Sequence, residues 1–208
     1  MIIVSLGPNC HTAGFLKELQ YKNCSYPFDW ILSNLNIVTY NISNNFNDFI
    51  NRDNYIYTTN KKITLKSKHI NYLNDTFVHK NPIENIEDFN YYLRCIERFK
   101  KLKENNKSIL FCYTSYNNEC ICDAFITDLH KLLYVLNKSY TNFYLLIFNF
   151  VTVENINQEN TFNYIINDKL ITINISISYD NKLYARDYAI KNFFKMFNPI
   201  EEIIVKLK

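Results

Sequence analysis

Two segments of this chain are apolar at almost every position, and they restrict the fold more than any other feature of the sequence. Residues 108–114 and 143–151 show no regular alternation of polar and apolar side chains. Strands of that kind are typical of sheets buried on both faces. The segment between them, 123–137, carries apolar residues at the spacing of an amphipathic helix. The pattern therefore predicts parallel strands that are joined by helices.

The rest of the chain extends this pattern. Apolar runs predict strands at 2–6 and 170–177 and an edge strand at 203–205, and apolar residues three and four apart predict helices at 10–20, 33–50, 86–104 and 182–197. Four short segments have the pattern of strands: 55–59, 63–67, 70–73 and 76–79. We expect one α/β domain over residues 1–208, with a mostly parallel sheet flanked by helices and a small β-rich insertion near 52–80.

Glycine is rare in this chain, and both copies lie beside one cysteine. The 208 residues include two glycines, against roughly fourteen at the average usage of about 7%. Asn, Ile, Tyr, Phe and Lys replace them, which is typical of an AT-rich genome. Gly7 and Gly14 nevertheless each lie within four residues of Cys10, and residues 7–30 also hold two of the four prolines and the single tryptophan. This clustering indicates a backbone geometry around Cys10 that other residues cannot adopt.

Cys10 is placed where a thiol can act as a nucleophile. A cysteine in the first turn of a helix lies among unpaired N–H groups at the positive end of the helix dipole, and both favour the thiolate. Gly7 would provide the sharp exit from the preceding strand, and Gly14 would let another element approach the helix closely. Backbone N–H groups there, with Asn9, could bind a developing oxyanion. A small structural cysteine in a tight turn fits the same pattern equally well.

A thiolate enzyme needs a base, and the chain offers four histidines. His11 adjoins Cys10, but successive helix positions point about 100° apart, so it is a poor partner. We expect His130 at the surface of its helix and His69 in a solvated, Lys-rich hairpin. His79 follows an apolar run, so its backbone would leave the core while its side chain emerges at a strand end. His79 is therefore the candidate base.

Charge and motifs exclude several classes of partner. The net charge of +3 is too small to indicate nucleic-acid binding, and the basic residues around Arg94 and Arg98 fit a solvated helix face. No Lys-Ser/Thr follows Gly14, so the first turn is not a P-loop. The single Cys-x-Cys pair at 120–122 is a weak metal signal. We expect neither a metal nor another cofactor.

The chain shows no targeting or membrane segment. The first residues are apolar over too short a run for a signal peptide and lack a basic start. The longest apolar run, 142–153, is shorter than the ~20 residues that span a bilayer. We expect a cytoplasmic protein, in the host cytoplasm if the genome is viral, with no membrane association. Its six cysteines would then be reduced thiols.

Two stretches near the N-terminus carry a family resemblance. Ser5-Leu-Gly-Pro-Asn-Cys-His-Thr-Ala13, followed by Ser25-Tyr-Pro-Phe-Asp-Trp30, resembles the signature of a family of papain-like cysteine peptidases of uncharacterised function, found in bacteria and large DNA viruses. Phe77-Val-His79 is similar to that family's Phe-x-His-Asp element, and Arg94-Cys-Ile-Glu-Arg-Phe99 to its Arg-Arg-Ile-Glu-Arg-Phe helix. The matches cover about the first 115 residues.

The resemblance implies that Cys10 is the nucleophile and His79 the base. The chain departs from the family at two positions: Lys80 stands where the family usually has Asp, and Cys95 replaces the first arginine of the helix. Another carboxylate would then orient the imidazole, and Asp29 is the candidate. The family label also implies a papain-like α+β fold, which is the alternative to the α/β sheet expected from the pattern of strands and helices.

Two functions follow from these residues. In the first, the chain is a thiol hydrolase or acyl transferase for a peptide or acyl substrate, with Trp30, Arg94 and Arg98 as weaker candidates for substrate binding. In the second, the chain is a non-catalytic module that holds a phosphate ligand at the helix start between Gly7 and Gly14. The sequence does not define an oligomeric state.

Overall fold

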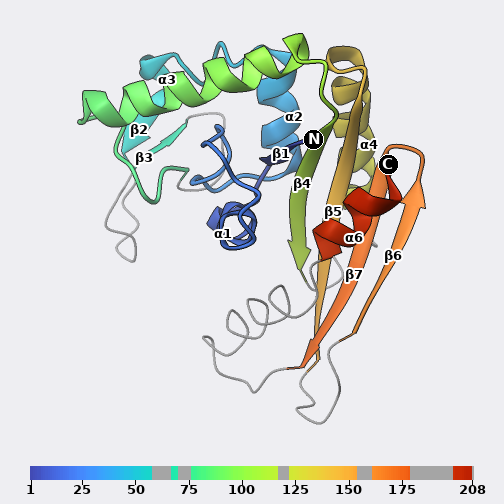
Figure 1. Ribbon diagram of the computed structural model, residues 1–208. Helices are drawn as coiled ribbons and strands as arrows, with labels where there is room; N and C mark the ends of the chain where they lie inside the picture. The colour runs from blue at the N-terminus through green and yellow to red at the C-terminus, as the bar shows by residue number, and fades with distance from the viewer. Residues whose placement is uncertain (58–66, 70–75, 117–121, 154–160, 179–198, 208) are drawn as a thin grey trace.

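The fold is built around a five-stranded sheet (Figure 1). The computed structural model describes residues 1–57, 67–69, 76–116, 122–153, 161–178 and 199–207. In spatial order the strands are β1 (Ile2–Ser5), β4 (Ile109–Tyr116), β5 (Phe143–Val153), β7 (Leu170–Ser178) and β6 (Thr161–Asn167). All neighbouring pairs are parallel except β6 and β7, which are antiparallel. The predicted α/β class with a mostly parallel sheet is confirmed.

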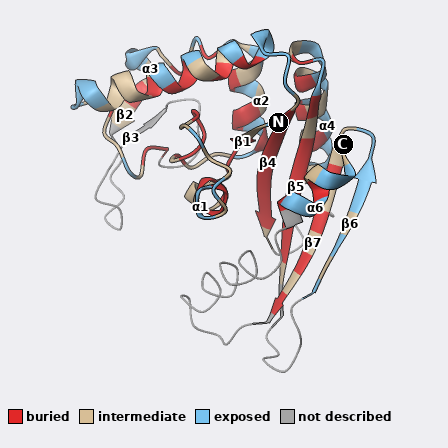
Figure 2. Ribbon diagram, viewed as in Figure 1, coloured by how far each residue is buried: buried red, intermediate tan, exposed pale blue. Residues whose placement is uncertain are grey.

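Helices cover both faces of this sheet. One face carries α2 (Leu35–Ser43), α3 (Ile86–Lys100) and α4 (Asp123–Ser139), whose buried side chains share a core with β1, β4 and β5. The other face carries α1 (Cys10–Glu18) and α6 (Pro199–Lys206) in a second core with β4, β5 and β7. Figure 2 shows β4 and β5 buried along most of their length, as their apolar sequences require, with β6 as an exposed edge.

The β-rich insertion is a two-stranded antiparallel sheet of β2 (Tyr55–Tyr57) and β3 (Ser67–His69), preceded by a 3-10 turn, η1 (Arg52–Asn54). Its second strand shares only Ser67 with the strand predicted at 63–67, whose other residues are not described. Residues 58–66 and 70–75 lie outside the described part of the chain, and so does the predicted helix at 182–197. After α3, a second 3-10 turn, η2 (Lys101–Glu104), completes the helix predicted at 86–104.

The structure differs from the predicted elements at three points. The segment 203–205, expected as an edge strand, belongs to α6, because Ile200 and Ile203 are three apart and are both fully buried on one helix face. The strand β6 was not predicted. The second helix ends at Ser43 rather than near residue 50, because Asn45 and Phe46 adopt positive φ angles of 55° and 60°.

Candidate functional site

The turn before Cys10 continues the pairing of β1 with β4. The N–H of Leu6 donates to the carbonyl oxygen of Cys112 (2.8 Å), and the N–H of Thr114 donates to that of Gly7 (3.2 Å). Gly7 has a φ of +101° and is joined to Pro8 by a cis peptide bond. A Cβ at Gly7 would overlap Ser33 Oγ. The backbone angle therefore requires glycine at this position, as the sequence indicated, and any larger residue would also displace the Ser33 hydroxyl group.

Cys10 is the first residue of α1, at the carboxyl end of β1. Asn9 is the N-cap, and its side-chain oxygen accepts the N–H of His11 (2.9 Å). The Cys10 side chain is half-buried. An N-terminal thiol of this kind lies close to the helix dipole, which was the expected setting. The side-chain oxygen of Asn9 already accepts the N–H of His11. The groups left as the proposed oxyanion donors are therefore the Cys10 N–H and the side-chain amide nitrogen of Asn9.

Two hydrogen bonds join the Cys10 turn to the segments that carry Trp30 and His79. The N–H of Ser33 donates to the carbonyl oxygen of Pro8 (2.7 Å), and the N–H of Leu32 donates to that of Thr76 (2.9 Å). His79 is exposed, and its ring meets the ring of Trp30 edge-on with centroids 6.0 Å apart. Segment 30–33 thus contacts both segment 7–10 and segment 76–79, although the three lie far apart in the sequence.

The position of His79 follows from its local sequence. Thr76 and Phe77 are fully buried, Val78 is half-buried and His79 is exposed. Phe77 packs against Tyr55 and Tyr92 with ring centroids 5.1 and 5.0 Å apart. The chain therefore leaves the core between Phe77 and His79, as the apolar run predicted.

Asp29 has contacts other than the expected one with His79. Its carboxylate is fully buried and pairs with Lys22 Nζ, and the N–H of Tyr26 donates to Oδ2 (2.7 Å). Burial raises the pKa of the Asp29 carboxyl, and Lys22 partly offsets this rise. The other oxygen, Oδ1, has no hydrogen-bond partner among the described residues. The role of Asp29 as the group that orients His79 stays a prediction.

Lys80 and Cys95, the two residues that depart from the family pattern, each contact another side chain. Lys80 Nζ pairs with Asp88 Oδ1 (3.0 Å) and lies over the ring of Tyr91, 4.5 Å from its centroid. Cys95 is buried and its sulfur lies 3.1 Å from Arg98 Nη2. Burial raises the pKa of the Cys95 thiol although Arg98 lowers it in part. Neither side chain bonds to His79.

The two arginines that were candidates for substrate binding differ in their surroundings. Arg98 Nε donates to the carbonyl oxygen of Ser25 (3.1 Å), so this side chain ties α3 to the segment that leads to Trp30. Arg94 is exposed on the same helix. Substrate binding by Trp30, Arg94 or Arg98 stays a prediction, and so does the phosphate-binding module at the start of α1.

The described residues do not support the reason given for Gly14. A Cβ built at Gly14 has no described atom within 4 Å. No described element therefore uses the missing side chain for a close approach.

Sequence reasoning also missed two threonines that support the turn. Thr12 Oγ1 is fully buried and donates to the carbonyl oxygen of Gly7 (2.6 Å), and it lies 2.7 Å from Thr114 Oγ1. Thr12 lies one helical turn after the cap, on the face directed away from solvent. This position was the only feature of the sequence that could have indicated its bond to the turn.

The structure also shows the surroundings of His11 and His130. His11 Nδ1 lies 2.9 Å from the hydroxyl of Tyr116 at the end of β4, and the two rings meet edge-on. His11 is thus directed toward β4, in line with the expectation that it is a poor partner for Cys10. His130 is exposed on α4, as expected.

The described residues give no sign of a metal centre. Among them, no group of three or more His, Cys, Asp or Glu side chains is arranged to hold a metal ion, and the five described cysteines form no disulfide bond. Cys122 is the N-cap of α4, where its sulfur accepts the N–H of Phe125 at 3.4 Å. None of the described helices is long and apolar enough to cross a membrane.

Comparison with known proteins agrees with the resemblance seen in the sequence. A family model described as "Putative papain-like cysteine peptidase (DUF1796)" matches residues 1–175. The chain is also similar to "Uncharacterized protein R408" of Acanthamoeba polyphaga mimivirus, with 26% identity over 176 residues that cover 71% of this chain and 78% of the relative. No solved structure matches the chain.

Proposed function

The chain belongs to the family described as "Putative papain-like cysteine peptidase (DUF1796)", and from this premise we propose that it is a thiol hydrolase or acyl transferase that uses Cys10 and His79. One observation carries the proposal. The half-buried Cys10 opens α1 at the carboxyl end of a parallel strand, and ligands of α/β sheets bind at that edge. The segment around Leu32 and Ser33 supports this pairing, because Ser33 N–H donates to Pro8 in the Cys10 turn and Leu32 N–H donates to Thr76, three residues before His79.

The proposed reaction has two steps. The Cys10 sulfur attacks the carbonyl carbon of a peptide or acyl compound, and its proton passes to the His79 imidazole. His79 then returns that proton to the leaving group as the bond to the carbonyl carbon breaks, which leaves an acyl group on the sulfur. In the second step water or another acceptor attacks this thioester with His79 as the base, and the thiol is restored.

The local backbone supports charge development in the first step. The Cys10 N–H and the amide nitrogen of Asn9 are the donors proposed for the oxyanion. Asn9 keeps its orientation because its oxygen is bonded to the N–H of His11. The ring of Trp30 restricts the His79 imidazole on one side, and we assign Trp30 to positioning this ring rather than to chemistry.

Reactivity of the thiol tests the proposal without knowledge of the substrate. The full chain is treated with chloroacetamide between about pH 5.5 and 9, and modification of each cysteine is measured by peptide mass mapping. Near pH 6.5 a free thiol is only about 1% ionised. We expect Cys10 to react at least about tenfold faster there than free cysteine, and His79→Ala to remove most of that advantage.

Matched variants separate this effect from folding. Cys122→Ser removes the exposed thiol on α4 and serves as the control, which should leave labelling of Cys10 unchanged. Cys10→Ala should keep the circular dichroism spectrum while it abolishes hydrolysis of a mixed fluorescent peptide library. A Cys10 alkylation profile that follows free cysteine across the pH range, in wild type and His79→Ala alike, contradicts the proposal.

A further inference from the structure

The strand β6 is the edge of the sheet that is left open to solvent. It is last in the order of strands and pairs on one side with β7, and Figure 1 shows no described element beyond it. In an antiparallel pair, every second residue directs its N–H and C=O groups away from the neighbouring strand. The outer side of β6 therefore presents a row of backbone donors and acceptors, which is the surface that another β-strand recognises.

The sequence of β6 lacks the features that normally protect a sheet edge. Natural edge strands are very short, or they carry charged side chains, proline or a bulge. The strand reads Thr161-Phe-Asn-Tyr-Ile-Ile-Asn167, with no charged residue and no proline. Its residues pair one to one with β7, from Thr161 with Ser176 to Asn167 with Leu170, so it contains no bulge. Nothing in this strand opposes pairing with a further strand.

Apolar side chains are exposed on both faces of β6. Ile165 is 62% exposed and Ile166 is 41% exposed. Successive residues of a strand point to opposite faces of the sheet. Ile165 lies on the side of α4, where it lines a cavity of ≈ 340 Å³ together with Leu129 of that helix, and Ile166 lies on the side of α6. A strand placed beside β6 would therefore cover apolar surface on both faces.

The other edge of the sheet does not offer a matching strand. The strand β1 has four residues, of which Val4 and Ser5 are buried. A head-to-tail contact between β6 of one copy and β1 of the next would therefore have few exposed groups to pair. Antiparallel pairing of β6 with β6 of a second copy uses the same edge in both molecules and closes as a two-fold symmetric dimer.

The residues of β6 are complementary to one another when two copies pair about an axis through Tyr164. Tyr164 then lies opposite Tyr164 of the second copy, and Ile166 lies opposite its Phe162, so aromatic and aliphatic side chains meet on the α6 side. On the α4 side Ile165 lies opposite Asn163 of the second copy. Because no residue of the strand is charged, this pairing involves no repulsion and no loss of hydration from a charge.

We propose that two copies of this chain associate through antiparallel pairing of their β6 strands. The five-stranded sheet of each copy joins that of the other into one continuous sheet, and Ile165 and Ile166 become covered in both copies. Cys10 follows β1, at the opposite edge of the sheet. The dimer is therefore independent of the proposed hydrolase activity.

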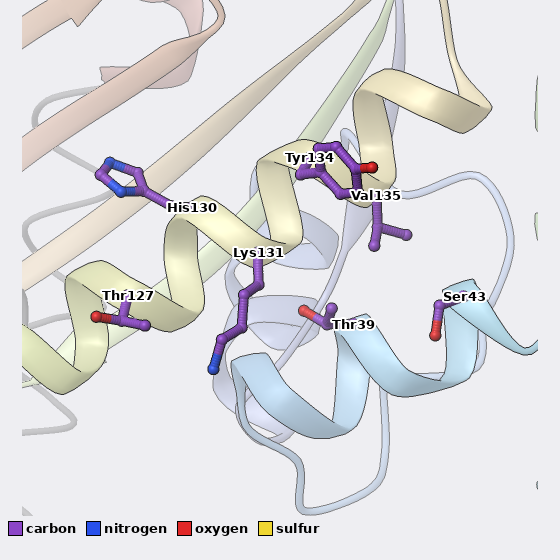
Figure 3. A pocket seen from close by; sticks show the side chains of 7 residues that line it. All are labelled: Thr39, Ser43, Thr127, His130, Lys131, Tyr134 and Val135. Carbon is purple, nitrogen blue, oxygen red and sulfur yellow. The ribbon is translucent and has the colours of Figure 1, made fainter.

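A groove between α2 and α4 serves as the reference surface. Its volume is ≈ 580 Å³, and in it Thr39 and Ser43 face Lys131 and Tyr134 (Figure 3). Tyr134 is 61% exposed, and Lys131 already pairs with Asp128 (3.0 Å). The backbone groups along both helices are bonded within their own helix, so this groove has no row of donors and acceptors for a strand.

Sedimentation velocity of the full chain tests the proposal. Wild type is measured between about 2 and 200 µM, because the population of a dimer depends on protein concentration. We expect the weight-average mass to rise with concentration from that of one copy toward that of two. The mass of one copy at every concentration overturns the proposal. A mass that rises beyond two copies also overturns it, since pairing of β6 with β6 leaves neither edge open.

Four variants locate the contact. Ile165→Lys and Ile166→Lys each place a charge on one face of the edge strand, and each should raise the dissociation constant at least about tenfold. Both positions are exposed, so the substitutions keep the fold. Ile86→Lys makes the same change at a 52% exposed position at the start of α3, and Tyr134→Ala removes the ring from the reference groove.

The two control variants should leave the dissociation constant unchanged. A dimer that Ile165→Lys and Ile166→Lys leave intact overturns the proposal. A dimer that Ile86→Lys or Tyr134→Ala weakens as much as the two β6 variants do overturns it as well, because the contact would then lie on another surface.

Discussion

The buried hydroxyl groups of Thr12 and Thr114 lie 2.7 Å apart and join the first turns of α1 to the carboxyl end of β4. Thr12 also donates to the carbonyl oxygen of Gly7 (2.6 Å), and the N–H of Thr114 donates to the same oxygen (3.2 Å). One carbonyl group therefore receives a bond from the helix and from the strand. This arrangement fixes the direction in which the chain enters α1, and with it the position of Cys10.

Thr12→Val tests how much these bonds contribute. The substitution keeps the shape of the side chain but leaves Thr114 Oγ1 and the Gly7 carbonyl oxygen with fewer partners, so the free energy of unfolding should fall by about 1–3 kcal/mol. The measurement is urea unfolding followed by circular dichroism. Thr39→Val is the control, because the Thr39 hydroxyl donates only to Leu35 of its own helix, and its effect should stay below about 0.5 kcal/mol.

A double-mutant cycle shows whether the two hydroxyls act together. The cost of Thr12→Val combined with Thr114→Val should be smaller than the sum of the single costs by about 0.5–1.5 kcal/mol, since the second substitution removes a group that the first has already left unpaired. Additive costs would show that the two hydroxyl groups do not interact in solution.

The two glycines should respond in opposite directions to alanine. Gly7→Ala forces a side chain onto a φ of +101° and against Ser33 Oγ, so it should lower the free energy of unfolding by about 1–2 kcal/mol or more. Gly14 is inside α1 with open space around it, so Gly14→Ala should raise that free energy by about 0.5–1 kcal/mol. Urea unfolding of both variants measures the contrast, and a loss in Gly14→Ala equal to that in Gly7→Ala contradicts it.

This contrast shows how far the sequence could define the candidate site. Glycine scarcity located the Cys10 turn correctly, because a positive φ is a local backbone requirement that composition can report. The same scarcity assigned a packing role to Gly14, where the structure shows none among the described residues. The bonds of Thr12 and Ser33 depend on contacts between segments that are distant in the sequence, and no local pattern encodes them.

The helices and strands show the same contrast: those with a long local pattern were predicted closely, and those that depend on distant contacts were not. The strands β4 and β5 and the helix α4 were predicted closely because their apolar patterns extend over eight or more residues. The edge strand β6 has no fully buried residue, and only Phe162 and Tyr164 pack partly against the second core, so burial leaves little pattern in its sequence. The last helix, α6, has three consecutive β-branched residues that favour a strand, but burial of Ile200 and Ile203 against the sheet overrides that preference.

Removal of the Lys22 ammonium should make stability depend on pH. Lys22 is the counter-ion of the buried Asp29 carboxylate, whose pKa is already raised by burial. Lys22→Met leaves that charge unpaired and raises the pKa further, so the folded state retains its stability at low pH and loses it as the pH rises through the new pKa. We expect a loss of about 3–5 kcal/mol at pH 7 and a much smaller one near pH 4.

The double variant is the control for this experiment. Lys22→Met with Asp29→Asn has no ionisable group at either position, so the large loss of stability that Lys22→Met alone shows between pH 4 and pH 7 should be absent from the double variant. An equal loss at pH 4 and pH 7 in Lys22→Met alone would contradict the assigned ion pair.

Buried tyrosines should make the folded protein less stable at alkaline pH. Tyr55, Tyr92 and Tyr140 lie in the aromatic core, and burial raises the pKa of each phenol well above its usual value of 10.0. In the unfolded chain these phenols ionise near their usual pKa, while in the folded chain they stay protonated. Above about pH 10 the unfolded state therefore binds fewer protons than the folded state, and the free energy of unfolding falls as the pH rises.

The slope of that fall measures how many phenols are involved. With an unfolded pKa near 10, each buried tyrosine contributes about 1 kcal/mol between pH 10 and 11, so these three together should lower the free energy of unfolding by about 3 kcal/mol over that interval. Tyr140→Phe removes one phenol while it keeps the ring that packs on Phe111 at 5.1 Å, and it should reduce the fall between pH 10 and 11 by about 1 kcal/mol. Urea unfolding at several pH values provides the measurement. A slope that Tyr140→Phe leaves unchanged would mean that Tyr140 ionises in the folded protein as readily as in the unfolded chain.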